Sequence, residues 1–181
     1  GWVGVAVSPG AHDLTFSDLT IYRTYQDGVC IYPQLSTDTS NVASPDRIWI
    51  INGSITDTGY MAANPSWATH GIFAAGGTGH AFKQIQFKNN YNGYSIELDR
   101  AGSQVTECII NNKLMIGSNT RDLVNTNRSN WIYRNKFVGP GSFDIGDVNT
   151  KDPGSSVHPD DGWVLFNNTF INTVLNFSRD V

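Results

Sequence analysis

A six-residue unit recurs six times along the sequence. Its first and sixth positions are apolar and its third is polar. The copies occupy 16–21, 50–55, 82–87, 105–110, 132–137 and 165–170. Successive copies start 34, 32, 23, 27 and 33 residues apart, so the spacing varies while the unit is kept. Repeats at this interval predict a structure that stacks one supersecondary unit on the next.

The composition favours strands as the repeated element. Ile, Val and Thr number 43, whereas the good helix formers Ala, Leu, Glu, Lys and Met together number 27. Branched side chains suit extended backbone, which argues against helical bundles and helical solenoids. We therefore expect an all-β chain. Because 181 residues suit one folding unit, we expect a single domain over 1–181.

Each copy of the unit is followed by a second short β-like segment. These segments are 28–32, 71–75, 94–98, 122–125, 143–145 and 174–177, and 4–7 is similar. Two strands that meet at a polar corner, followed by a third strand, make one coil of a parallel β-solenoid. Coils stack at about 4.8 Å, so equivalent residues should form columns. The first and sixth positions should line the interior, and the third should form a hydrogen-bonded corner column.

This pattern resembles the right-handed parallel β-helix superfamily of pectate lyases, polygalacturonases and phage tailspikes. The resemblance rests on the six units and covers nearly the whole chain. It implies about six to seven coils, each ordered as strand PB2, corner T2, strand PB3, loop T3, strand PB1 and loop T1. The second segments are then the PB1 strands. Both ends would be uncapped, which implies a segment of a longer helix or ends covered by a partner.

Charge and hydropathy exclude several classes of partner. The net charge of −4 leaves no basic footprint for nucleic acid. No apolar run is long enough to cross a bilayer, so we expect no membrane span. Cys30 and Cys108 lack metal-type spacing, and we expect both as packed free thiols.

In the families that this chain resembles, sugar binds along the outward face of PB1, between the T3 and T1 loops. Long loops here are the places where solenoids usually carry function. These insertions are 33–46, 56–70, 111–121 and 148–162.

Aromatic residues on that face are candidate sugar platforms. Strand alternation turns Tyr32 and Phe73 outward, and Tyr60 and Trp67 lie in a T3 loop. The alternative is that these rings pack beneath the loops.

Four charged residues are candidates for catalysis. Glu97 and Asp144 face outward as general acid or base, with Asp99 as a partner and Arg100 for substrate charge. The expected register offsets Glu97 from Asp144 by two residues, which carries them beyond the separation of an inverting glycosidase. The alternative for Glu97, Asp99 and Arg100 is a solvated corner with an ion pair.

His70 is a candidate substrate-binding residue. It precedes a PB1 strand as Thr69-His-Gly-Ile72, which resembles the Gly-His-Gly of polygalacturonases, and Asp27-Gly-Val resembles their Asn-Thr-Asp-Gly. The paired aspartates of that family are absent. We expect no resident cofactor or metal, although some lyases use Ca²⁺ to neutralise a substrate carboxylate.

The sequence thus predicts a carbohydrate-directed β-helix that binds a polysaccharide, with cleavage by a lyase or glycoside hydrolase reaction left open. The alternative is a shaft or adhesin segment of a phage fibre or tailspike, without catalysis in this segment and with a homotrimer as its assembly. Both hypotheses place the protein outside the cell, at a cell surface or on a virion.

Overall fold

The computed structural model describes 2–32, 44–60, 69–91, 93–98, 102–112, 114–117, 129–145 and 163–177. All regular structure in these ranges is β, which confirms the all-β prediction. None of the described residues belongs to a helix that could cross a membrane.

Fourteen strands are formed within the described ranges. They are β1 (Val5–Val7), β2 (His12–Thr24), β3 (Val29–Ile31), β4 (Asp46–Thr58), β5 (Ile72–Ala74), β6 (Ala81–Lys88), β7 (Ile96–Leu98), β8 (Gln104–Thr106), β9 (Ile109–Asn111), β10 (Leu114–Gly117), β11 (Asn130–Tyr133), β12 (Lys136–Ile145), β13 (Trp163–Phe166) and β14 (Thr169–Phe177).

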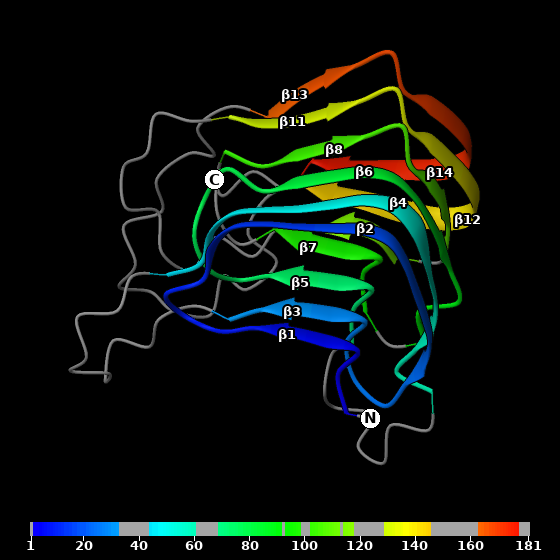
Figure 1. Ribbon diagram of the computed structural model, residues 1–181. Coiled ribbons are helices and arrows are strands. Elements are labelled where there is room, and N and C mark those ends of the chain that lie inside the picture. The colour runs from blue at the N-terminus through cyan, green and yellow to red at the C-terminus, as the bar shows by residue number, and fades with distance from the viewer. Residues whose placement is uncertain are drawn as a thin grey trace, which may run out of the picture.

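Every strand pairing within the described residues is parallel, and each strand pairs with its equivalent one winding away. One stack runs β1, β3, β5, β7, β10, β12, and another runs β2, β4, β6, β8, β11, β13. Figure 1 shows these windings rising in chain order from the blue end to the red end. The arrangement is one large parallel sheet, consistent with a β-solenoid. We call β1, β3, β5, β7, β10 and the second halves of β12 and β14 the PB1 strands.

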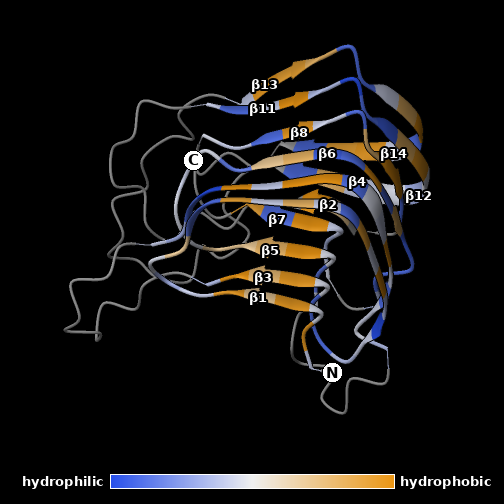
Figure 2. Cartoon of the chain, viewed as in Figure 1, coloured by the Kyte–Doolittle hydropathy of each residue, from blue (hydrophilic) through white to orange (hydrophobic). Residues whose placement is uncertain are grey.

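The register confirms both predicted apolar columns. Residues at the first position of the unit pair in succession: Phe16, Ile50, Phe82, Val105, Ile132 and Leu165. Those at the sixth position do the same: Ile21, Ile55, Phe87, Ile110, Phe137 and Phe170. Phe82, Phe87 and Phe137 are fully buried. The core is therefore built from side chains stacked between windings, and the apolar strand centres are visible in Figure 2.

The backbone conformation explains why the third position of the unit is always polar. All six residues there adopt positive φ, between 54° and 58°: Asp18, Asn52, Gln84, Glu107, Arg134 and Asn167. This left-handed conformation turns the chain through the corner, and it is disfavoured for the β-branched residues of the strands. Neighbouring corners also bond to each other, as Asn52 Nδ2 donates to Asp18 and Gln84 Nε2 donates to Glu107.

One predicted PB1 strand is wrong in position. The strand that pairs β7 with β12 is β10, at Leu114–Gly117, whereas the sequence suggested 122–125. Segment 122–125 lies outside the described residues. The apolar run around Met115 and Ile116 supplies two fully buried side chains to the core, which is why this segment forms the strand.

Both cysteines are free and buried, as predicted. Burial raises the pKa of each thiol, Cys30 and Cys108, to about 12. Neither thiol is therefore ionised as a nucleophile near neutral pH.

Candidate functional site

The middle residues of β1, β3, β5 and β7 belong to a column that alternates with the apolar inner one, and this column continues through later windings. The pairings run Ala6, Cys30, Phe73, Glu97 and Gly117, and Asp144 pairs with Asn176. We call this set the outer PB1 column.

Glu97 and Asp144 stand in the same column. Ile96 pairs with Ile116, and Ile116 pairs with Phe143, so the residues that follow, Glu97 and Asp144, lie at equivalent positions two windings apart. The expected two-residue offset is therefore wrong. The reason is that Phe143, which is fully buried, takes the inner place in line with Ile96 and Ile116. The two backbone positions are about 9.6 Å apart along the stack, at about 4.8 Å per winding.

Glycines bring the residues before these strands close together. A Cβ at Gly28 would lie 2.6 Å from the carbonyl oxygen of Gly71, and one at Gly71 would lie 2.4 Å from that of Ser95. Because the windings approach this closely, the preceding residues Asp27 and His70 are also brought into contact.

His70 bridges two carboxylates from neighbouring windings. Its Nδ1 lies 3.1 Å from Asp27 Oδ1, and its backbone N–H donates to that same oxygen at 2.7 Å. Its Nε2 lies 2.6 Å from Glu97 Oε2, an ion-pair contact that is not aligned as a hydrogen bond. All three residues are buried. The result is a buried row of carboxylate, imidazole and carboxylate.

The row favours the charged form of His70. Burial by itself lowers the pKa of an imidazole, but the contacts with Asp27 and Glu97 outweigh it and raise the pKa of His70 to about 9. His70 is therefore a cation at neutral pH, and its ring stacks on Phe73 with centroids 4.9 Å apart. Phe73, half-buried, is thus partly used in packing against His70.

Asp144 is surrounded by donors. Tyr94 Oη donates to its Oδ2 at 2.8 Å, Ser142 Oγ donates to the same oxygen at 3.0 Å, and Asn176 Nδ2 donates to its Oδ1 at 2.6 Å. Burial and the contact with Asp144 raise the pKa of Tyr94, so its hydroxyl keeps its proton. Tyr94 comes just before β7, so it links the winding of Glu97 to that of Asp144.

The other candidate residues are dispersed. Tyr32 follows β3 and is 41% exposed, which leaves its ring available to a ligand. Tyr60 lies at the corner after β4, where its ring packs against Tyr91 and Arg23 instead of the outer PB1 column. Asp99, Arg100 and Trp67 lie outside the described residues.

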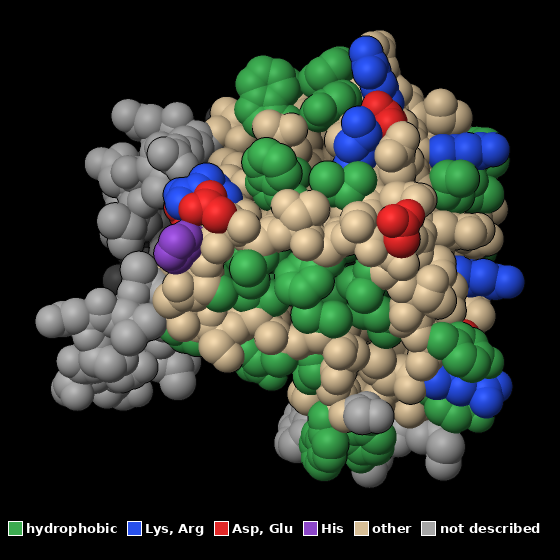
Figure 3. Space-filling view, in the orientation of Figure 1, with side chains coloured by type: hydrophobic (Ala, Val, Ile, Leu, Met, Phe, Trp, Pro, Cys, Tyr) green, Lys and Arg blue, Asp and Glu red, His purple; other side chains and the backbone are tan. Residues whose placement is uncertain are grey.

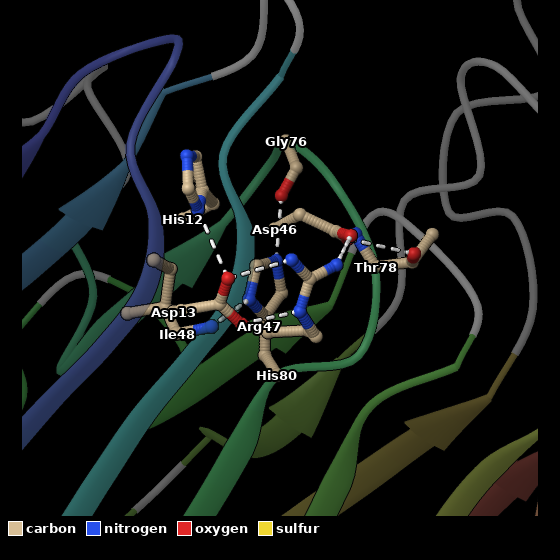
Figure 4. A network of polar contacts seen from close by, with 8 residues as sticks. All are labelled: His12, Asp13, Asp46, Arg47, Ile48, Gly76, Thr78 and His80. Carbon is tan, nitrogen blue, oxygen red and sulfur yellow. Dashed lines mark hydrogen bonds and ion pairs between the residues drawn. The ribbon is translucent and has the colours of Figure 1, made fainter.

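A second polar network occupies the corner that leads into β4 and β6 (Figure 4). Arg47 bonds to Asp13 and Asp46, which are on different windings, and Asp46 accepts from Thr78. Beside them His80, fully buried, bonds through Nε2 to Gly76 O and accepts at Nδ1 from the Ile48 N–H. Burial lowers the pKa of His80, so it is neutral. This network joins windings and offers no free catalytic group.

Metal binding finds no support in the part of the chain that the structure describes. No group of three or more His, Cys, Asp and Glu side chains there is arranged to hold an ion. The Ca²⁺ of the lyase hypothesis stays a prediction.

Sequence reasoning identified Glu97, Asp144, Phe73 and His70 but not the partners of His70 and Asp144. Asp27 could have been found, because Asp-Gly and His-Gly precede consecutive PB1 strands and aligning the glycines aligns Asp27 with His70. Tyr94, Ser142 and Asn176 carry no such signal, since their bonds depend on the register of windings far apart in sequence.

The protein has no detectable similarity to known proteins by three comparisons: no family model matches it, and no curated protein or solved structure is significantly similar.

Proposed function

We propose that the chain is a right-handed parallel β-helix of the pectate-lyase-like and tailspike-like type, and that it binds a polysaccharide along the outer PB1 column. Right-handedness is supported by the general rule that parallel strands joined by crossovers connect in that hand. The stacked parallel windings support the architecture.

The alignment of Glu97 with Asp144 carries the proposal. The half-buried Asp144 and the buried Glu97 share one line, and the exposed ring of Tyr32 and the half-buried ring of Phe73 lie on the windings before them. Carboxylates and aromatic rings are the kinds of group that a sugar chain uses. Its hydroxyls donate to carboxylate oxygens, and its apolar faces contact aromatic rings. His70 and Tyr94 act as positioning residues that hold these acceptors in place.

Binding is tested by titrating the protein with a panel of neutral, amino and acidic polysaccharides, using calorimetry. We expect at least one polymer to bind, and Glu97→Gln or Asp144→Asn to weaken its binding about tenfold, which corresponds to the loss of one charge-assisted hydrogen bond. Asp18→Asn is the matched control, because Asp18 lies at a corner in β2, outside the outer PB1 column, and Asn52 in β4 already adopts the same corner conformation. Equal loss in the control, or no binding by any polymer, contradicts the proposal.

Cleavage is the second candidate function, favoured by the spacing of the same two residues. Inverting glycosidases hold their carboxyl groups about 6.5–9.5 Å apart, close to the backbone separation here. One carboxyl group would protonate the glycosidic oxygen while the other takes a proton from the attacking water. Cleavage is tested by measuring the release of reducing ends from a bound polymer. A polymer that stays intact after long incubation would exclude cleavage and retain binding as the only function.

A further inference from the structure

A second exposed aromatic group lies away from the PB1 strands. Trp131 and Tyr133 project from β11 and Phe166 from β13, on residues that alternate with the inner apolar column. Tyr133 and Phe166 stack at 4.8 Å with their planes 4° apart, and Trp131 meets Phe166 edge to face at 6.3 Å. Trp131 is 44% exposed and Phe166 is 39% exposed. Figure 3 shows hydrophobic side chains at the surface over these strands.

Basic side chains border these rings. Lys83 Nζ and Arg134 Nη1 each lie 3.8 Å from Glu107, so two cations share one carboxylate. Lys83 belongs to the same column as Tyr133, through Thr106. Arg134 directly follows Tyr133, and its side chain is 62% exposed. The local excess of positive charge contrasts with the net charge of −4 of the whole chain.

We propose that Trp131, Tyr133, Phe166, Lys83 and Arg134, the β11–β13 aromatic surface, bind an oligosaccharide that carries carboxylates. Exposed rings take the apolar faces of sugars, and Arg and Lys pair with carboxylates. Because the chain carries a net charge of −4, a carboxylate-bearing sugar gains more from Lys83 and Arg134 than the apolar face of a second copy would. The surface is separate from the outer PB1 column and does not depend on the function proposed for it.

Trp49 provides a matched control, because it belongs to the same column as Trp131, through Ala81 and Gln104. It is 45% exposed, like Trp131, but its column neighbours are Thr15 and Ala81. Among the described residues it stacks on no other ring. If exposure of an indole were enough for binding, Trp49 and Trp131 would behave alike.

The test is a fluorescence and calorimetric titration of the protein with a uronic acid hexamer and with a neutral glucose hexamer. We expect the uronate to bind and the neutral sugar to bind at least tenfold more weakly, with affinity falling as ionic strength rises. Trp131→Ala should weaken uronate binding about tenfold, while Trp49→Ala leaves it unchanged.

Arg134→Gln is a second variant that keeps all the rings. Its corner conformation is one that Gln84 already adopts, so the fold should persist, and uronate binding should fall. Equal affinity for both hexamers, unchanged binding in Trp131→Ala, or no uronate binding at all would overturn the proposal. Sedimentation provides one more outcome that would overturn it. The parent protein would self-associate, Trp131→Ala would be monomeric, and neither would bind sugar.

Discussion

His70 Nε2 lies 2.6 Å from Glu97 Oε2, although the two residues belong to different windings of the chain. With Asp27 on the other side of the ring, this places a cation between two buried carboxylates. The contact therefore couples three windings and fixes the carboxylate that we propose to meet the ligand.

The stability of the fold should fall as pH rises from about 6.5 to about 9. In the unfolded chain His70 loses its proton near its ordinary pKa of about 6.5, whereas in the fold the pKa is about 9. The stabilisation is fully present below the lower value and is lost through the higher one, about 3 kcal/mol in all. Urea unfolding across this range measures it. His70→Gln is the control, and an unchanged slope in this variant contradicts the assignment.

His80 should act in the opposite direction. Its folded pKa lies below the ordinary value because it is buried as the neutral ring, so its contribution is present above about pH 6.5 and is lost as pH falls. Protonation would also end the hydrogen bond that Nδ1 accepts from the Ile48 N–H. Nuclear magnetic resonance titration of the two buried rings should find His80 neutral where His70 is charged. Two similar titrations would exclude this arrangement.

The corner conformation should govern substitution at Asn52. Its φ of 58° is strained for a β-branched residue, so Asn52→Val should reduce the free energy of unfolding by about 1–2 kcal/mol more than Asn52→Gly. Both variants lose the bond to Asp18, which isolates the backbone effect. Chemical denaturation of the pair gives the difference, and equal stabilities would show that the corner is not the cause.

Close approach of the windings should make Gly28 intolerant of a side chain. A Cβ there would lie 2.6 Å from both Gly71 O and Ile55 Cγ2, so Gly28→Ala should cost about 1–3 kcal/mol by overpacking. Ser95 holds the equivalent position one winding beyond Gly71 and already carries a Cβ. Ser95→Ala, the control, should be tolerated, since no described residue bonds to the buried Ser95 Oγ. A Gly28→Ala protein as stable as the parent would contradict the packing.

Much of the fold could be predicted because its signal is local and repeated. An apolar residue at each end of the unit and a polar one at the left-handed corner are visible in any one copy, as in Phe82, Gln84 and Phe87. The PB1 strand predicted at 122–125 was misplaced because the loops differ in length, so the spacing between repeats does not show which apolar run forms the last strand of a winding. Here Met115 and Ile116 close it.

The site was less predictable because it depends on register. The register between β10 and β12 shifts between Leu114 and Ile116, and this shift decides that Asp144 shares a column with Glu97. The hydrogen bond from Tyr94 to Asp144 joins residues that are far apart in the sequence, so no local motif predicts it.

Mapping of backbone amide shifts on addition of a bound neutral or amino polysaccharide tests the proposed function most directly. We expect the perturbed amides to cluster in β3, β5, β7 and the second half of β12, around Phe73, Glu97 and Asp144. Glu97→Gln should reduce these perturbations. Perturbations confined to other surfaces, or spread evenly over the protein, would contradict it.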